Sequence, residues 1–160
     1  MNRQPTLEGE LVVVRPLFAE DFDQLYTVAA DPLLWEQHPE RERWREDVFR
    51  AYFDDHLASG GALGVVDRAS DALIGVSRYD NYDPEASEVE IGWTFLARPY
   101  WGGAYNADLK RVMLGHAFQS VETVVFLVGA RNLRSRRAVE KLGAVESGER
   151  RGMMLYAVHR

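Results

Sequence analysis

The segment "VEIGWTFLARPYWGGAYNADLKRVML", residues 89–114, is the part of the sequence that decides the fold. Its first residues alternate between apolar and polar or small side chains, which is the two-residue period of a strand. After a short break, apolar residues recur from residue 107 onward at intervals of three and four, which is the period of a helix. The apolar strand face consists of Val89, Ile91, Trp93 and Phe95, and the helix face of Leu109, Val112, Met113 and Ala117.

Two adjacent glycines, Gly102 and Gly103, lie between this strand and this helix. A loop of this kind leaves unpaired amides at the start of a helix, where the helix dipole favours an anion such as a phosphate. The alternative is that the glycines only form a tight turn between the two elements. Neither common nucleotide motif is present, because the loop has no G-x-G-x-x-G series and no Gly-Lys-Ser/Thr ending.

The rest of the chain supplies strands and helices on both sides of this segment. A continuous β-branched and apolar run at 123–129 predicts a strand buried on both faces, as in a parallel pairing with a helical crossover. The order β-α-α-β-β-β-α-β-α-β-β predicts an α/β fold of the α+β type, a mixed sheet of about seven strands with helices on both faces. We expect strands at 10–17, 62–67, 72–82, 87–96, 123–129, 144–150 and 153–160, helices at 22–30, 42–57, 107–118 and 132–143, and a loop at 31–40.

Composition restricts the class of protein. The chain has 160 residues, so we expect one domain over 1–160. Its net charge of −6 argues against a nucleic-acid partner, and no apolar run is long enough to predict a membrane span. The polar N-terminus lacks the apolar core of a signal peptide, so we expect a cytoplasmic location. The absence of cysteine excludes disulfides and a Cys nucleophile, and the four histidines lack metal-ligand spacing, so we expect no metal.

Three segments together resemble a known family. They are "LEGELVVVRPLFAEDFDQLYTVAADPLLW" (7–35), "VEIGWTFLARPYWGGAYNADLKRVMLGHAF" (89–118) and "VVFLVGARNLRSRRAVEKLGA" (124–144). In this order they resemble the GCN5-related N-acetyltransferases (GNAT), and among these the RimJ/RimL-like branch. The resemblance implies an enzyme that moves an acetyl group from acetyl-CoA directly to a primary amine, on a protein N-terminus or a small molecule. It also implies splayed fourth and fifth strands, and a homodimer as one expected assembly.

The resemblance assigns residues to acetyl-CoA as co-substrate. The loop after the fourth strand would hold the pyrophosphate through backbone amides, the end of that strand would pair with the pantetheine arm, and an Asn after the fifth strand would contact it. The loop departs from the family pattern Gln/Arg-x-x-Gly-x-Gly/Ala, because its glycines lie one position earlier. The residues assigned in this way are Thr94, Phe95 and Leu96 on the strand, Trp101, Gly102, Gly103, Ala104, Tyr105 and Asn106 in the loop, and Asn132 and Ser135 beyond the fifth strand.

Acetyl transfer to an amine needs a group that takes the amine's proton and a source of a proton for the departing thiolate. Glu90, on the polar strand face, is the predicted base; the alternative is that Glu88 and Glu90 are solvated or pair with arginines. The helix at 132–143 has no Tyr, so Ser135 is the predicted acid by analogy with the branch. The alternative is that Ser135 bonds only to backbone or cofactor and that solvent supplies the proton.

Basic and aromatic side chains supply further candidates. In the cationic cluster, Arg137 is the residue that we expect to bind a phosphate of CoA, and a solvated helix face is the alternative for each member. The segments 31–40 and 77–83 are expected to select the acceptor. The cluster consists of Arg131, Arg134, Arg136, Arg137, Lys110 and Arg111, and the aromatic residues that would line the acceptor groove, unless they pack in the core, are Trp35, Tyr79, Tyr82 and Trp93.

Two rival functions use the same features of the sequence. The first is a non-catalytic acyl-CoA-binding or sensing domain on the same fold, which the altered glycine loop and the missing Tyr motivate. The second is an interaction module that has lost the cofactor. Release of free thiol separates the enzyme from the first rival, and binding of CoA separates both from the second.

Overall fold

Eight strands form one mixed sheet at the centre of the molecule, and the computed structural model describes all residues from 1 to 160. The strands are β1 (Leu7–Glu8), β2 (Val12–Pro16), β3 (Ala62–Asp67), β4 (Leu73–Asp83), β5 (Glu88–Leu96), β6 (Thr123–Val128), β7 (Val145–Arg150) and β8 (Met153–His159). Their order in the sheet is β1-β2-β3-β4-β5-β6-β8-β7, and only β5 and β6 pair in parallel. The predicted mixed fold is confirmed, with the short β1 as the additional strand.

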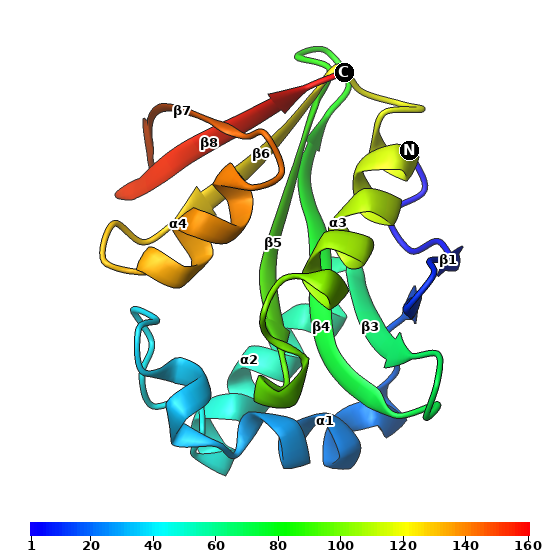
Figure 1. Ribbon diagram of the computed structural model, residues 1–160, viewed down its shortest axis with the longest axis vertical. Helices are drawn as coiled ribbons and strands as arrows, with labels where there is room; N and C mark the ends of the chain where they lie inside the picture. Colours follow the sequence, from blue (N-terminus) through cyan, green and yellow to red (C-terminus); the bar gives the residue numbers. More distant parts are fainter.

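Four α-helices cover the two faces of this sheet (Figure 1). They are α1 (Phe22–Ala29), α2 (Glu46–Ser59), α3 (Ala104–Ala117) and α4 (Leu133–Glu140). Side chains of α1 and α2 form one apolar core with Val76 and Phe95, on one face of the sheet. Those of α3 and α4 form a second core with Val65 and Ile91, on the opposite face. No helix combines the length and the apolar character needed to cross a membrane.

Several helix boundaries differ from the expected ones. The helix α3 begins at Ala104 rather than at residue 107, because Gly103 is already its N-cap residue. The helix α2 begins at Glu46 rather than at residue 42, and it ends before the left-handed Gly60, as expected. The expected loop at 31–40 contains a short 3-10 turn, Pro32–Trp35, whose first amides are capped by Asp31.

The alternation expected for residues 88–95 holds only as far as Ile91. Val89 and Ile91 lie in the core beneath α3, whereas Phe95 lies in the core beneath α1 and α2. The reason is a bulge: Gly92 pairs with Arg78 and Phe95 with Val76, so β5 carries one residue more than β4 at this point. Trp93, with a positive φ of 51°, lies at the bulge. The additional residue turns every later side chain of β5 to the opposite face.

The strands β5 and β6 diverge after a short parallel pairing, as Figure 1 shows. Glu88, Val89 and Glu90 pair with residues 123–125 of β6, and no pairing follows further along β5. β6 pairs instead with β8 over its whole length. The predicted splay between two central strands is therefore confirmed. The expected fourth and fifth strands are β5 and β6, because the short β1 precedes them.

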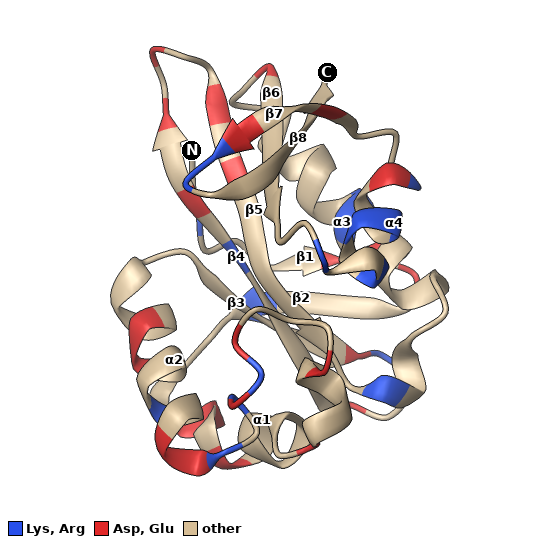
Figure 2. Cartoon of the chain, turned by 90° about the vertical axis from the view of Figure 1, so that its left-hand side faces the viewer, with Lys and Arg blue, Asp and Glu red and all other residues tan.

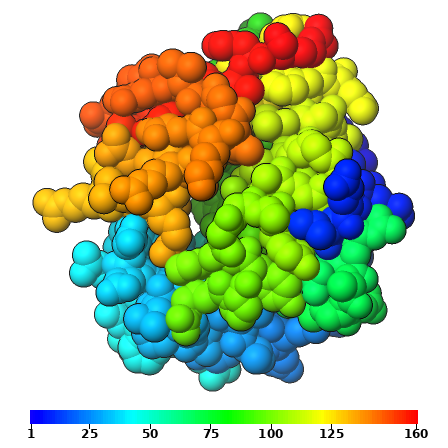
Figure 3. All heavy atoms as spheres, in the orientation of Figure 1, coloured from blue at the N-terminus to red at the C-terminus, as the bar shows by residue number.

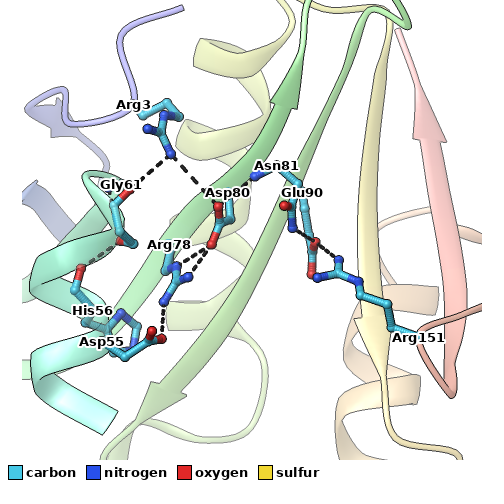
Figure 4. A network of polar contacts seen from close by, with 10 residues as sticks. Arg3, Asp55, His56, Gly61, Arg78, Asp80, Asn81, Glu90 and Arg151 are labelled. Atoms are coloured by element: carbon cyan, nitrogen blue, oxygen red, sulfur yellow. Dashed lines mark hydrogen bonds and ion pairs between the residues drawn. The ribbon is translucent and has the colours of Figure 1, made fainter. Parts of the chain in front are cut away.

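A buried histidine on α2 has no hydrogen-bond partner. His56 is completely buried, and neither ring nitrogen is bonded. The ring packs edge-on against Tyr52 with 4.4 Å between the centroids, and it lies near Arg78, which is bonded to Asp55 and Asp80 (Figure 4). Burial, and secondly the positive charge of Arg78, lowers the pKa of His56 to about 3. The imidazole is therefore neutral at neutral pH.

We expect acid to destabilise the fold through His56. The ordinary pKa of 6.5 applies in the unfolded chain, whereas the folded protein keeps the ring neutral down to about pH 3. Between these values the unfolded state binds one proton more, so the free energy of unfolding falls as the pH falls, by up to about 1.4 kcal/mol per pH unit. Urea unfolding of His56→Leu between pH 6.5 and 4 should show a correspondingly shallower pH dependence.

Phe53→Leu is the matched control, because Phe53 is a buried residue of the same helix that does not titrate. It should lower stability equally at every pH and leave the wild-type slope unchanged. A His56→Leu curve that runs parallel to the wild-type curve would contradict the prediction.

Candidate functional site

Two connected hollows open at the split between β5 and β6. The outer groove has a volume of about 550 Å³ and lies between the start of α3, α4 and the 34–38 segment. The inner hollow, of about 150 Å³, continues between the diverging strands toward α2. Figure 3 shows the outer groove as a depression between the orange α4 region and the green start of α3. The residues that line both hollows are Trp35, His38, Thr94, Asn106, Asn132, Ser135 and Ala138.

A row of free backbone amides lies at the outer groove. The N–H groups of residues 102–106 have no acceptor in the protein, and the first bond of the helix runs from Ala107 N–H to Gly103 O at 2.8 Å. Gly102 and Gly103 have φ values of 110° and 115°, in the region that favours glycine. A Cβ on either glycine would meet no atom within 4 Å, so the space in front of the amides is open. This geometry suits a bound phosphate group.

Some side chains of the predicted loop line the outer groove, and others bond to the rest of the protein. Trp101 and Asn106 line the outer groove, whereas Tyr105 turns away and donates its hydroxyl to Asp67 at 3.0 Å. The Trp101 indole donates to the Leu96 carbonyl at 2.8 Å, which fixes the loop against the end of β5. Ala104 and Tyr105 therefore contribute amides to the site and no side chains to the groove wall.

Basic side chains of α4 and of the residue after it line the outer groove, in the region of α4 that is blue in Figure 2. They are Arg134, Arg137 and Lys141, so the predicted Arg137 does lie at the groove. Arg134 stacks on the Trp101 ring, with its guanidinium carbon 3.7 Å from the ring centroid. Arg136 of the same cluster turns away and donates to the Tyr156 hydroxyl at 3.1 Å. The outer groove thus combines free amides and positive charge, as an anion requires.

Two polar side chains at the start of α4 are free to bind a ligand. Asn132 is buried, and its Oδ1 accepts the Ser135 N–H at 3.3 Å as the helix cap. Its Nδ2 donates to no acceptor in the protein, and neither does the Ser135 hydroxyl. Both residues line both hollows. They offer a hydrogen-bond donor and a hydroxyl at the junction of the two spaces.

The end of β5 faces the hollows with an edge that has no strand partner. Thr94 lines both hollows, and Phe95 and Leu96 line the outer groove. No strand pairs with them on the β6 side, because pairing ends at Glu90. An extended polar chain can therefore pair with this edge, as in strand addition.

A buried lysine, which the sequence places only in the cationic cluster, lines the inner hollow. Lys110, on α3, is 4% exposed, and its Nζ donates to Thr94 Oγ1 at 2.6 Å and to Ser77 Oγ at 3.3 Å. No carboxylate forms a salt bridge with it. Burial lowers the pKa of Lys110 to about 7. A lysine that exchanges its proton near neutral pH is a candidate for acid–base chemistry.

The predicted base, Glu90, is held in an ion pair. It is 3% exposed, and its Oε2 accepts from Arg151 at 2.5 Å and from Asn81 at 2.7 Å (Figure 4). Glu88 is bonded to Arg150 at 2.6 Å, so both glutamates have the arginine partners of the alternative interpretation. Glu90 lines neither hollow, but its Oε1 lies 3.7 Å from the point where a Cβ on Gly92 would be.

The predicted acceptor residues lie in different places. Trp35 and Trp93 line the inner hollow, as expected. The prediction for Tyr79 is wrong: the side chain is completely buried in the core beneath α3, and its hydroxyl donates to the Met113 carbonyl at 2.6 Å. Tyr82 packs partly buried against the same core and lines neither hollow, because it lies near the far end of β4, within a second register shift between Asp80 and Asp83.

Further lining residues come from segments without a periodic pattern. Arg43 and Tyr52 line the inner hollow, with the Arg43 guanidinium carbon 4.1 Å from the centroid of the Tyr52 ring. His38 lines both hollows, and burial, with the positive charges of Arg43 and Arg134 as further causes, lowers its pKa to about 4. His38 and Arg43 come from the loop before α2 and Tyr52 from α2 itself, and no sequence signal marks them as lining residues. No group of three or more His, Asp or Glu side chains could hold a metal ion.

Taken together, the two hollows suit an elongated ligand. Its anionic end would lie at the amides of 102–106, its middle at the free edge of β5 and at Asn132, and its reactive end near Thr94 and Ser135. The inner hollow would admit a second molecule from the α2 side. Such an arrangement serves a transfer between two bound substrates.

Comparisons with known proteins agree with this geometry. Residues 12–145 match the family model for the acetyltransferase (GNAT) domain. A search of curated proteins finds no significant match. Among solved structures, a GCN5-related N-acetyltransferase from Brucella melitensis is similar, with a TM-score of 0.85, 18% identity and coverage of 98% of this chain and 79% of that one.

Two further structures share the fold. The acetyltransferase from Agrobacterium tumefaciens str. C58 has a TM-score of 0.77 and 22% identity, with 98% of this chain and 95% of that one covered. Mycobacterium smegmatis RimJ, solved in complex with CoA-disulfide, has a TM-score of 0.70 and 18% identity, with 97% and 86% covered. Since the family model spans most of the sequence and the fold agrees, the chain belongs to the GNAT acetyltransferase family.

Proposed function

We propose that this protein is an acetyl-CoA-dependent N-acetyltransferase of the RimJ/RimL-like branch, which transfers the acetyl group directly to a primary amine. The observation that carries the proposal is the row of free amides at residues 102–106 beside the unpaired edge of β5. The acceptor is an amine on a protein N-terminus or a small molecule. The three sequence segments at 7–35, 89–118 and 124–144 support the choice of branch.

The residues present fit CoA in its chemistry. The amides of 102–106 and the cations Arg134 and Arg137 would bind its phosphates. The free edge of β5 at 94–96 and the Asn132 Nδ2 would bind the amides of its pantetheine arm. When bound, acetyl-CoA supplies an acetyl thioester, whose carbonyl carbon is the site of attack.

The inner hollow would receive the amine that is acetylated. Trp35, Trp93 and Tyr52 provide apolar walls for the part of the acceptor next to its amine. Glu90 would take the proton of the amine through a water molecule that passes Gly92, since Oε1 carries no hydrogen bond from the protein. The Ser135 hydroxyl would bond to the thioester sulfur.

A non-catalytic acyl-CoA-binding domain is the second candidate, and the ion pair between Glu90 and Arg151 is the observation that favours it. A thiol-release assay decides between the two. Purified protein and acetyl-CoA are mixed with N-terminal peptides, polyamines, aminoglycosides and amino acids, and free CoA is measured. Thiol release that depends on an amine supports the enzyme. Binding of acetyl-CoA without release for any amine supports the rival.

We expect Gly103→Ala to weaken CoA binding. A side chain at φ 115° strains the backbone by about 1–2 kcal/mol, and its Cβ would stand in the open space before the amides. Relief of that strain displaces the amides of the loop, so the dissociation constant for CoA should rise about tenfold, since 1.4 kcal/mol is a factor of ten. Isothermal titration calorimetry measures the change.

Gly115→Ala is the matched control. Gly115 is an exposed glycine within the same helix, and a Cβ there also meets no atom within 4 Å. This change should stabilise the protein by about 0.5–1 kcal/mol through helix propensity and leave CoA affinity unchanged. Equal CoA affinity of Gly103→Ala and wild type would remove the amide row from the binding site.

Glu90→Gln should lower turnover about 100-fold or more at neutral pH, because a general base contributes about 10²–10⁴-fold. The rising limb of its pH profile should shift, while the dissociation constant for CoA stays within about twofold of the wild-type value. Steady-state thiol release and calorimetry give the two quantities.

Glu88→Gln is the control for loss of an arginine partner. Glu88 lies one pleat away on the same strand and is bonded to Arg150, but it is more distant from Gly92. Its pH profile should keep the wild-type shape. Equal effects of the two substitutions would assign Glu90 a structural role only.

A further inference from the structure

The departing thiolate needs a proton, and α4 offers only the Ser135 hydroxyl for this purpose. An alcohol gives up a proton far less readily than an ammonium group does. The one ammonium group that lines the hollows and is bonded to a second lining residue is Lys110.

The bulge in β5 connects Lys110 to the reactive end of the site. Because of the additional residue at Trp93, the Thr94 side chain turns toward α3, where its Oγ1 accepts from Lys110 Nζ at 2.6 Å. The Thr94 hydroxyl also bonds to the Ser77 hydroxyl at 2.8 Å, and Lys110 contacts Ser77 at 3.3 Å. Thr94 lines both hollows, whereas Ser77 lines neither. A proton can thus pass from Lys110 to the Thr94 hydroxyl, and from there to a group bound at the junction of the hollows.

We propose that Lys110, acting through the Thr94 hydroxyl, is the source of the proton that the thiolate receives when it leaves. This inference rests on the proposed acetyltransferase function. Thr94 is the group at the junction of the hollows. Lys110 holds its hydroxyl in position by a hydrogen bond and resupplies its proton.

The bonds and protons balance as follows. The amine nitrogen forms the C–N bond, and its proton goes through water to Glu90. The C–S bond breaks with its electron pair on sulfur, and sulfur takes the Thr94 hydroxyl proton while Thr94 takes one from Lys110 Nζ. Lys110 then regains a proton from solvent and Glu90 releases one, so the products are the N-acetylated amine and free CoA thiol.

The surroundings of Lys110 leave its proton mobile. Ser77 of β4, Thr94 of β5 and the Phe126 ring of β6 face its Nζ, and none of them is charged. Across the hollow lie the neutral His38 and the cation Arg43, and Glu90 behind Gly92 is bonded to Arg151. Burial is the only cause that lowers the pKa of Lys110, to about 7. A donor with this value is suited to neutral pH.

The test is a pH profile of thiol release at saturating acetyl-CoA and acceptor. Loss of a proton makes both the amine and Glu90 more reactive, so neither of them produces a decline at high pH. Loss of the Lys110 proton should produce one, and wild-type turnover should fall above about pH 7–8. Lys110→Met should be about 100-fold slower at pH 7 and should show no such decline.

Thr94 variants separate the relay from packing. Thr94→Val keeps the shape and removes the hydroxyl, so it should behave as Lys110→Met does. Thr94→Ser restores a hydroxyl and should restore both the rate, to within about fivefold, and the decline at high pH. CoA affinity, measured by calorimetry, should stay within about threefold of wild type in Lys110→Met.

A second measurement needs no activity. The folded protein holds Lys110 neutral above about pH 7, whereas the unfolded chain keeps the lysine protonated up to its ordinary value of 10.5. The cost of burying its charge is therefore fully present below pH 7 and disappears as the pH rises toward 10.5. Lys110→Met should melt at a higher temperature than wild type at pH 6, and the difference should shrink by pH 9.5.

The outcomes separate the two proposals. Absence of thiol release from the wild type with every amine overturns the acetyltransferase function and this inference with it. Wild-type turnover combined with a decline at high pH that persists in Lys110→Met overturns the inference alone. A Lys110→Met variant that is no more stable than wild type at pH 6 also overturns it, because Lys110 would then hold its proton without cost.

Discussion

The end of β5 is a strand edge inside the sheet that has no strand partner, and the site is built around it. A buried strand edge leaves backbone groups without partners, which is costly unless something satisfies them. Side chains satisfy two of the carbonyls: Tyr52 donates to Trp93 O at 2.9 Å, and the Trp101 indole donates to Leu96 O. β8 pairs with one edge of β6 throughout, while the other edge of β6 pairs with β5 only as far as Val125. The end of β5 is therefore a place inside the sheet, away from its two outer edges, where backbone groups are left for a ligand.

The bulge that accompanies the split determines which side chains reach the site. Without the additional residue, Phe95 would share a face with Ile91, and the Thr94 hydroxyl would point toward α2. With it, Phe95 completes the core beneath α1 and α2, and Thr94 meets Lys110. The positive φ of Trp93 is a strained conformation for a large side chain. Stacking of Arg78 on its ring, at 4.1 Å from the centroid, and the bond from Tyr52 hold it there.

Local patterns predict most of the fold, since they depend on neighbours in the sequence. The periods of β5 and α3 and the glycine pair between them place the loop correctly, and the helix expected at 132–143 is present as α4. The bulge at Trp93 is not predicted, because the alternation of apolar and polar residues continues through it in the sequence. Tyr79 is misplaced for a related reason: an aromatic residue on a strand has the same appearance whether it faces a core or a groove.

Contacts distant in sequence account for the other differences. The partner of Glu90 is 61 residues away on the turn before β8, and no local rule connects the two. His38 and Arg43 reach the hollows only because the segment between α1 and α2 folds over the split, and Tyr52 reaches them from α2. In the sequence, Lys110 cannot be told apart from the other cations of the cluster. Only the packing of α3 on the sheet places its side chain among Ser77, Thr94 and Phe126.

Electrostatics divide the site into a part for binding and a part for chemistry. At the outer groove, free amides and arginines gather on an otherwise acidic protein, and their fixed charge selects an anion. At the inner hollow a single lysine is buried without a counter-ion. A carboxylate beside it would stabilise the fold by compensating the charge, but it would also hold the proton in place. The fold thus forgoes stability at Lys110, which agrees with the proposed role of this lysine as a proton donor.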